Sequence, residues 1–295
     1  MPFLSGFADE AAADLDGQIR ATRELGWTRI EARNIGGKNI HEIDDETFDI
    51  VCNKLQAAGI KINAFGSTVA NWGKQVTDPM DVTWGEVSRA IPRMKRLGVK
   101  TIRIMSFAKL PDRGPDDQME QERFHRIREI VKRFTQEGLL PLHENCMNYG
   151  GMGWTYTLKL IEKVPGLKLI FDTGNPVCAE DMIKPEPRPK QSSWEFYKNV
   201  REHVAHVHIK DGKIGPDGKP VWGFPGEGDG DVRRIAEDLL RRGYQGGFSI
   251  EPHMAVVFHD PTQQSEAGVR YSNYVEYGRR MAALLRSIQP DVRLD

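Results

Sequence analysis

Four residues whose side chains can bind a metal ion stand at the ends of short apolar segments. Glu144 ends the segment PLHE, Asp172 ends LIFD, His208 ends AHVH and Glu251 ends FSIE. Three carboxylates and one imidazole make a hard ligand set, mostly of oxygen. Such a set suits Mn²⁺ or Mg²⁺ better than structural Zn²⁺, which prefers sulfur and nitrogen. The pattern predicts a divalent metal site, with catalytic Zn²⁺ and Co²⁺ left open. The competing interpretation is that these residues are solvated strand ends with separate roles.

The segments that carry these residues belong to a regular alternation along the chain. Eight short runs rich in apolar and β-branched residues are separated by amphipathic stretches with helical spacing, several of which end at a glycine. This pattern predicts an α/β fold, a (β/α)8 TIM barrel that forms a single domain over residues 1–295. The alternative is a doubly wound open sheet, which usually has a glycine-rich first turn, and SGFADE is not such a turn. Strands are predicted at 3–7, 28–32, 60–65, 100–105, 139–144, 167–172, 204–209 and 247–251.

A closed barrel would bring the four candidate ligands together. The active sites of such barrels lie at the carboxyl ends of the strands. Glu144, Asp172, His208 and Glu251 end the fifth to eighth predicted strands, so their side chains can converge above the mouth of the barrel. Glu31 also stands at a strand end, that of the second strand, but it has no assigned role.

The composition restricts the class of protein. The formal net charge is −1, which argues against a nucleic-acid partner, because such proteins usually carry a basic patch. No run of about 18 apolar residues is present, and the first residues do not resemble a signal peptide. Three scattered cysteines are too few for a disulfide framework. We therefore expect a cytoplasmic protein that acts on a small molecule and has no membrane partner. Whether it forms a homo-oligomer is left open.

Several short motifs resemble those of one enzyme superfamily. They are HEN at 143–145, FDTGN at 171–175, HVHIKD at 206–211, GEGDGDV at 226–232 and SIEPH at 249–253. In this order they are similar to segments of the xylose isomerase-like TIM barrels, which include sugar isomerases and epimerases. The resemblance implies one divalent metal, often Mn²⁺, held by Glu144, Asp172, His208 and Glu251. It also implies that Glu144 and Glu251 are the catalytic residues that move substrate protons.

The chain departs from the free-ketose epimerases of this superfamily at two places. Those enzymes usually have a histidine three residues after the metal-binding aspartate, where this chain has Asn175. They also have an arginine soon after the metal-binding histidine, where this chain has Lys210 and Lys213. The metal chemistry is compatible with both changes. A free ketohexose is therefore not assigned as the substrate, and Asn175 and Lys210 are the predicted substrate-binding residues at these positions.

The segment after the seventh strand contains further candidates. Period-two alternation places His206 on the same face as His208 but one layer deeper, where it either supports His208 or fills the core, and we expect the second role. The glycine-rich residues 225–232 are expected to shape a loop rather than to bind a phosphate, and Glu227 within them is a candidate substrate contact. Trp222, with Trp72 and Phe224, is expected to form an apolar wall for a sugar ring. The loops after the third, sixth and eighth strands are predicted to cover the substrate.

Two kinds of reaction fit the predicted site. The first is an isomerase or epimerase of a sugar or keto-sugar, in which the metal stabilises an enediolate and a carboxylate removes the α-proton. The second is a lyase on the same scaffold, a keto-inositol dehydratase or an enzyme that eliminates the aglycone of a 3-keto-glycoside or C-glycoside. His143 is a further candidate site residue for the lyase, as an acid, base or substrate contact, although alternation turns it away from Glu144.

Two other functions are less compatible with the sequence. An apurinic endonuclease shares this fold but needs more histidine ligands and a basic groove, whereas this chain has eight histidines and a nearly neutral charge. A binding protein without catalysis would not need the complete ligand set, although aromatic residues also line binding pockets.

Overall fold

Eight parallel strands form the centre of the computed structural model, which describes residues 1–257 and 260–294. The strands follow the order β1-β12-β9-β8-β7-β6-β5-β2, and the two end strands of this order, β1 and β2, lie next to each other. The sheet therefore curls into a nearly closed barrel, as predicted, and the doubly wound alternative is wrong. The barrel strands are β1 (Phe3–Gly6), β2 (Arg29–Ala32), β5 (Lys61–Phe65), β6 (Thr101–Ile104), β7 (Leu140–Glu144), β8 (Lys168–Asp172), β9 (Val204–Ile209) and β12 (Gly247–Ile250).

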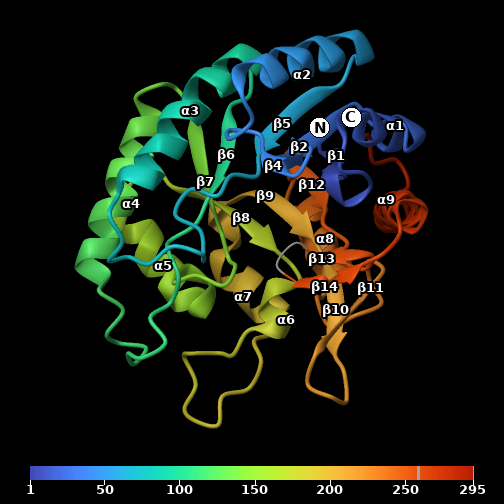
Figure 1. Cartoon of the computed structure of the whole chain (residues 1–295). Coiled ribbons are helices and arrows are strands. Elements are labelled where there is room, and N and C mark those ends of the chain that lie inside the picture. The colour runs from blue at the N-terminus through green and yellow to red at the C-terminus, as the bar shows by residue number, and fades with distance from the viewer. Residues whose placement is uncertain (258–259, 295) are drawn as a thin grey trace.

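Helices surround the barrel (Figure 1). Local signals begin and end several of them. Asp14 and Asp44 accept hydrogen bonds from the backbone at the starts of α1 and α2, and α2 ends at Gly59 with φ of 68°. Among the described residues, no helix has both the length and the apolar character needed to cross a membrane. The helices are α1 (Leu15–Glu24), α2 (Asp45–Ala58), α3 (Asp81–Leu97), α4 (Glu120–Thr135), α5 (Trp154–Lys163), α6 (Asn175–Cys178), α7 (Ser193–Val200), α8 (Val232–Arg241) and α9 (Ala267–Ile288).

The barrel strands have two different faces. Their outward side chains, such as Ile30, Val207 and Phe248, are buried in one apolar core with the helices. The inward side chains include charged residues, because the strand ends carry Glu31, Glu144 and others into the barrel. The mouth of the barrel therefore needs an internal balance of charge rather than an apolar filling.

Short antiparallel pairs extend the loops at the mouth. A hairpin of β10 (Asp211–Ile214) and β11 (Pro220–Gly223) follows β9 and projects away from the barrel (Figure 1). The other pairs are β3 (Asn34–Ile35) with β4 (Lys38–Asn39), and β13 (Val256–Val257) with β14 (Asp260–Gln264). The predicted covering loop after the eighth strand contains residues 258–259, which lie outside the described residues.

The carboxylate of Asp211 organises the glycine-rich loop that follows the hairpin. It accepts backbone N–H bonds from Gly212 at 2.9 Å, Gly226 at 2.7 Å, Gly228 at 3.2 Å and Gly230 at 2.9 Å. A Cβ atom at residue 228 would lie 2.4 Å from the backbone of Gly212, so only glycine allows this approach. The glycines therefore wrap a side chain of the protein itself, in agreement with the expectation that they shape a loop.

We predict that Asp211→Asn destabilises the protein by about 2–4 kcal/mol. The amide has one acceptor oxygen in place of two, so buried N–H groups of the loop lose their partner. The free energy of unfolding in urea measures the effect. Asp217→Asn is the control, because Asp217 is exposed and accepts one N–H bond, from Lys219. An equal effect of the two substitutions would contradict the proposed role of Asp211.

Candidate metal centre and active site

The structure brings the four predicted ligands together at the mouth of the barrel. They lie on or directly after β7, β8, β9 and β12, which are successive neighbours in the sheet. One ligand atom from each of Glu144, Asp172, His208 and Glu251 lies within 4.8 Å of the others, and all four residues are buried. Asp172 and His208 are direct partners in the register of β8 and β9. The neighbouring strand ends thus produce the cluster that the sequence pattern predicts.

Asp172 is oriented by the start of α6. Its Oδ1 accepts N–H bonds from Gly174 at 2.9 Å and Asn175 at 2.7 Å. The side chain of Asn145 also bonds the backbone of Asp172 in both directions, at 2.7 and 3.0 Å. The other oxygen, Oδ2, accepts no hydrogen bond and lies 3.1 Å from the ammonium of Lys210. One oxygen of Asp172 is therefore fixed by the backbone, and the other faces the cluster.

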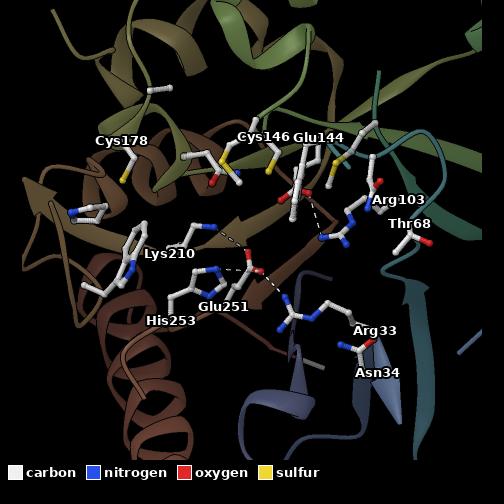
Figure 2. Close-up of a pocket in the computed structure, with 18 of the residues that line it drawn as sticks. Arg33, Asn34, Thr68, Arg103, Glu144, Cys146, Cys178, Lys210, Glu251 and His253 are labelled. Carbon is white, nitrogen blue, oxygen red and sulfur yellow. Dashed lines mark hydrogen bonds and ion pairs between the residues drawn. The ribbon is translucent and has the colours of Figure 1, made fainter. Parts of the chain in front are cut away.

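Each of the two glutamates pairs with an arginine from a distant segment. Arg33 donates to Oε1 of Glu251 at 2.6 Å, and Arg103 donates to Oε2 of Glu144 at 3.2 Å. Lys210 also donates to Oε2 of Glu251 at 3.1 Å. Figure 2 shows these side chains pointing toward one another from different strands. Three cations thus surround the carboxylates and offset their mutual repulsion.

These pairs shift the pKa values of the carboxyl groups in different directions. Burial raises the pKa of Glu251, but Lys210, His253 and Arg33 outweigh it and hold this pKa well below its ordinary value. The pKa of Glu144 is also lowered, because Arg103 and His208 outweigh burial. For Asp172, burial raises the pKa to about 6, and the nearby Glu251 and Glu144 contribute to the increase while Lys210 opposes it. Both glutamates are therefore ionised at neutral pH.

The donor set fits a divalent cation. Three carboxylates and one imidazole converge, and Asp172 Oδ2 is a buried oxygen without a hydrogen bond. Hard oxygen ligands of this kind suit Mg²⁺ and Mn²⁺. Lys210 holds a single positive charge between Asp172 and Glu251, at 3.1 Å from each. A divalent cation bound to the same oxygens would replace Lys210 as their counter-ion and leave its ammonium available to another group.

A cavity of about 340 Å³ opens beside the cluster. Its floor includes Glu144, Glu251 and Lys210, and its lining also contains the predicted substrate-binding residues Asn175 and Trp222. Trp222 stands edge-on to His253, with 5.5 Å between ring centroids, and Lys210 Nζ lies 5.6 Å from the centroid of its ring. The wall above the floor is mainly apolar and includes Trp72, Met105, Met147, Cys178, Ala179 and Pro220.

Three residues that were predicted to contact the substrate, His143, Glu227 and Phe224, lie outside the lining of this cavity. His143 is buried on the opposite face of β7 and bonds Ser106 at 3.0 Å and Asn148 at 3.2 Å, as alternation from Glu144 requires, so it does not line the cavity. Burial lowers its pKa to about 4, so its ring is neutral.

The prediction that Glu227 faces the substrate does not match its position. Its carboxylate pairs with Arg280 of α9 at 2.8 Å and is half exposed outside the cavity. Phe224 is also directed to α9, where the guanidinium of Arg280 lies 3.8 Å from its ring centroid. Both residues stand on a loop that Asp211 bends, so they turn toward the helix rather than the mouth of the barrel.

Arg33, Arg103 and His253 also line the cavity, but none of them was predicted as a site residue from the sequence. Arg103 had a recognisable signal, since it is a charge in the middle of the apolar strand TIRI. Arg33 follows Glu31 by two residues and so shares its inward parity. His253 has φ of 55° and bonds Glu10 at 3.0 Å through Nδ1, a position that no strand periodicity could indicate.

The fold and the site together define a TIM barrel with a buried cluster of candidate divalent-metal ligands at the carboxyl ends of its strands. The chain belongs to the xylose isomerase-like TIM barrel family, whose model matches residues 19–274. A search among curated proteins finds no match.

Solved structures share this fold at low sequence identity. A D-tagatose 3-epimerase-like protein is 17% identical with a TM-score of 0.70, covering 99% of this chain and 100% of its own. A probable 3-DHS dehydratase from Bacillus anthracis is 17% identical with a TM-score of 0.68, covering 96% of this chain and 99% of its own. A xylose isomerase-like TIM barrel protein from Mycobacterium smegmatis, in complex with magnesium, is 18% identical with a TM-score of 0.68, covering 96% and 97%. At these identities the similarity extends to the fold alone.

We predict that Asp172→Ala combined with His208→Ala removes bound metal. Half of the ligand set is then lost, whereas the outer shell of the barrel is unchanged. Metal analysis of the purified protein after incubation with Mn²⁺ measures this. His143→Gln is the control, since His143 is buried next to Glu144 but faces away from the cluster. If the double variant retains the metal content of the unmodified protein, the site lies elsewhere.

Proposed function

We propose that this protein is a divalent-metal-dependent isomerase or epimerase of a sugar or keto-sugar, with Mn²⁺ as the first candidate metal. The observation that carries the proposal is the convergence of Glu144, Asp172, His208 and Glu251 within 4.8 Å of one another, next to a cavity that Glu144 and Glu251 line. When bound, the cation would polarise the substrate carbonyl and stabilise the charge of an enediolate. Proton transfer and substrate binding are assigned to side chains of the protein.

Glu144 and Glu251 are the proposed acid–base residues. They stand on β7 and after β12, separated by two strands, so a substrate between them meets one carboxylate on each side. Two bases on opposite faces can remove a proton from one face and return it to the other, which inverts a stereocentre. Their low pKa values keep them ionised but make them weak bases, so accurate positioning has to compensate.

Asn175, Lys210 and Trp222 are the proposed substrate contacts. The side-chain nitrogen of Asn175 is buried at the cavity and has no hydrogen-bond partner among the residues that the structure describes, so it is available to a substrate oxygen. Lys210 would bind a substrate oxygen once a metal neutralises Asp172 and Glu251. Trp222 supplies an apolar surface for the C–H face of a sugar ring.

A lyase on the same scaffold is the second candidate, and His253 favours it. His253 lines the cavity, and its Nε2 lies 3.9 Å from Oε1 of Glu251. An elimination needs an acid for the leaving group in addition to the base that removes the α-proton. His253 adds an imidazole to the two glutamates and Lys210 at this cavity, and it is the group proposed to act as this acid.

We predict that Glu144→Gln and Glu251→Gln each lower turnover by about 10²- to 10⁴-fold, the usual contribution of a general base. Turnover is measured with a panel of ketoses, keto-inositols and 3-keto-glucosides in D₂O at saturating Mn²⁺, and the bound metal of each variant is measured as well. An epimerase incorporates deuterium at the inverted carbon. Release of a leaving group would instead support the lyase.

The control for these variants is Asp238→Asn. Asp238 is a buried carboxylate on α8, remote from the cavity, which accepts a hydrogen bond from Tyr197 at 3.0 Å. Its replacement should change stability but not turnover. Full activity of both glutamine variants would exclude proton transfer by these two residues.

We predict that Trp222→Ala raises KM more than it changes kcat, because the indole contributes binding surface but no reacting atom. Steady-state kinetics on the best substrate of the panel measure this, with Trp194→Ala as the control. Trp194 packs on α7 against Tyr197 and does not line the cavity. Unchanged kinetics together with a change in oligomer size would show that Trp222 belongs to a subunit interface instead.

A further inference from the structure

Glu31 lies inside the barrel and is completely buried. It belongs to β2, and its carboxylate reaches β9 across the interior. Oε2 lies 2.7 Å from Nε2 of His206, and Oε1 lies 3.0 Å from Nε2 of His208. One carboxylate therefore bridges two histidines of the same strand, below the cavity and outside its lining.

A buried carboxylate needs compensation for its lost hydration. The two imidazoles supply it, because each places its Nε2 within hydrogen-bond distance of one oxygen of Glu31. An ionised carboxylate can only accept hydrogen bonds. The Nε2 atoms of both histidines must therefore carry the hydrogens.

This hydrogen-bond pattern determines which nitrogen of His208 can bind a cation. Nε2 is committed to Glu31, so the lone pair for a metal has to be on Nδ1. Nδ1 faces the ligand cluster and donates its hydrogen to Oε1 of Glu144 at 3.0 Å, and a cation bound there would displace this proton. The ring of Phe7 stands edge-on to the imidazole, with 4.9 Å between centroids, and limits its rotation.

We propose that Glu31 is a positioning residue that, together with His206, holds His208 with its Nδ1 directed at the metal site. The proposal rests on the proposed metal-dependent function. Carboxylates that accept the second N–H of a metal-binding histidine fix its tautomer and raise its basicity. His206 has a part in this arrangement, because its hydrogen bond occupies the second oxygen of Glu31 and fixes the carboxylate. For His206 the proposal thus takes the alternative to core filling, a residue that supports His208.

Mn²⁺ affinity, measured by titration calorimetry on the metal-free protein, tests the role of Glu31. Glu31→Gln keeps the shape of the side chain but presents an NH₂ group to one of the two imidazole N–H groups. We expect a 10- to 100-fold weaker affinity, the usual effect of losing such a partner. The visible absorption spectrum of the Co²⁺-loaded protein should change too, since the orientation of His208 changes. Asp238→Asn, which removes a buried carboxylate remote from the site, should retain the affinity of the unmodified protein.

Two variants of His206 separate positioning from the loss of a negative charge. His206→Gln keeps an N–H donor that can reach Glu31 and should bind Mn²⁺ nearly as the unmodified protein does. His206→Leu removes the donor but keeps Glu31 and its negative charge. This variant should bind Mn²⁺ more weakly and show an altered Co²⁺ spectrum, because the carboxylate is no longer fixed. If the Glu31 variant does not fold, this pair decides the question alone.

The failure of this proposal and the failure of the metal site have different signatures. Unchanged Mn²⁺ affinity and an unchanged Co²⁺ spectrum in Glu31→Gln and His206→Leu would overturn the positioning role, provided that the Asp172 and His208 double variant loses metal. If the double variant also retains metal, both the ligand set and the role of Glu31 are wrong.

Discussion

Negative charge buried at the mouth of the barrel is the constraint on which the rest of the structure depends. Glu144, Asp172 and Glu251 lie together in a region of low dielectric constant, where like charges repel strongly. Such an arrangement is stable only if cations are placed against it with good geometry. For Glu251 these cations are Lys210 and Arg33, whose nitrogen atoms lie 3.1 and 2.6 Å from its carboxylate oxygens. The positions of both cations are therefore as strongly constrained as those of the candidate ligands.

The same constraint extends to the first residues of the chain. Besides its bond to Glu251, the guanidinium of Arg33 donates hydrogen bonds to Asp9 at 2.9 and 3.1 Å and to Glu10 at 3.3 Å. The guanidinium also lies over the ring of Phe7, 4.3 Å from its centroid. The connection after β1 is thus fixed by the same charges that surround the candidate metal site, so stability and site geometry share these contacts.

The fold and the clustering of the four candidate ligands could be predicted because their signals are local. Asp172 follows the apolar run LKLIF and Glu251 follows GFSI, so strand, strand end and ligand are all visible within a few residues. Alternation along β7 was also sufficient to turn His143 away from Glu144. The partners of these ligands could not be predicted in the same way. Arg33 and Glu251 are 218 residues apart, and nothing in one sequence connects them.

Loops and interior layers limited the prediction for other reasons. Glu227 lies between two glycines on a loop without periodicity, and its direction depends on the hydrogen bonds that Asp211 makes with the backbone. His206 was placed on the correct face by period two, but its function depends on Glu31, which comes from the other side of the barrel. The alternation of residues along a strand thus predicts the face on which a side chain lies, but it does not predict which residue from a distant segment contacts that side chain.

The hairpin β10–β11 divides the protein into a part that can vary and a part that cannot. Its base begins at Asp211, directly after Lys210, and is held to the glycine loop by that carboxylate. Its tip, residues 216–219, is exposed and closes its own turn through Gly215, which bonds Lys219 at 2.7 Å. Pro220 and Trp222 of β11 line the cavity, so a change at these positions alters its wall without moving the strand that carries His208. During evolution, or in a designed variant, the shape of the cavity can thus change along β11 while the candidate metal centre keeps its geometry.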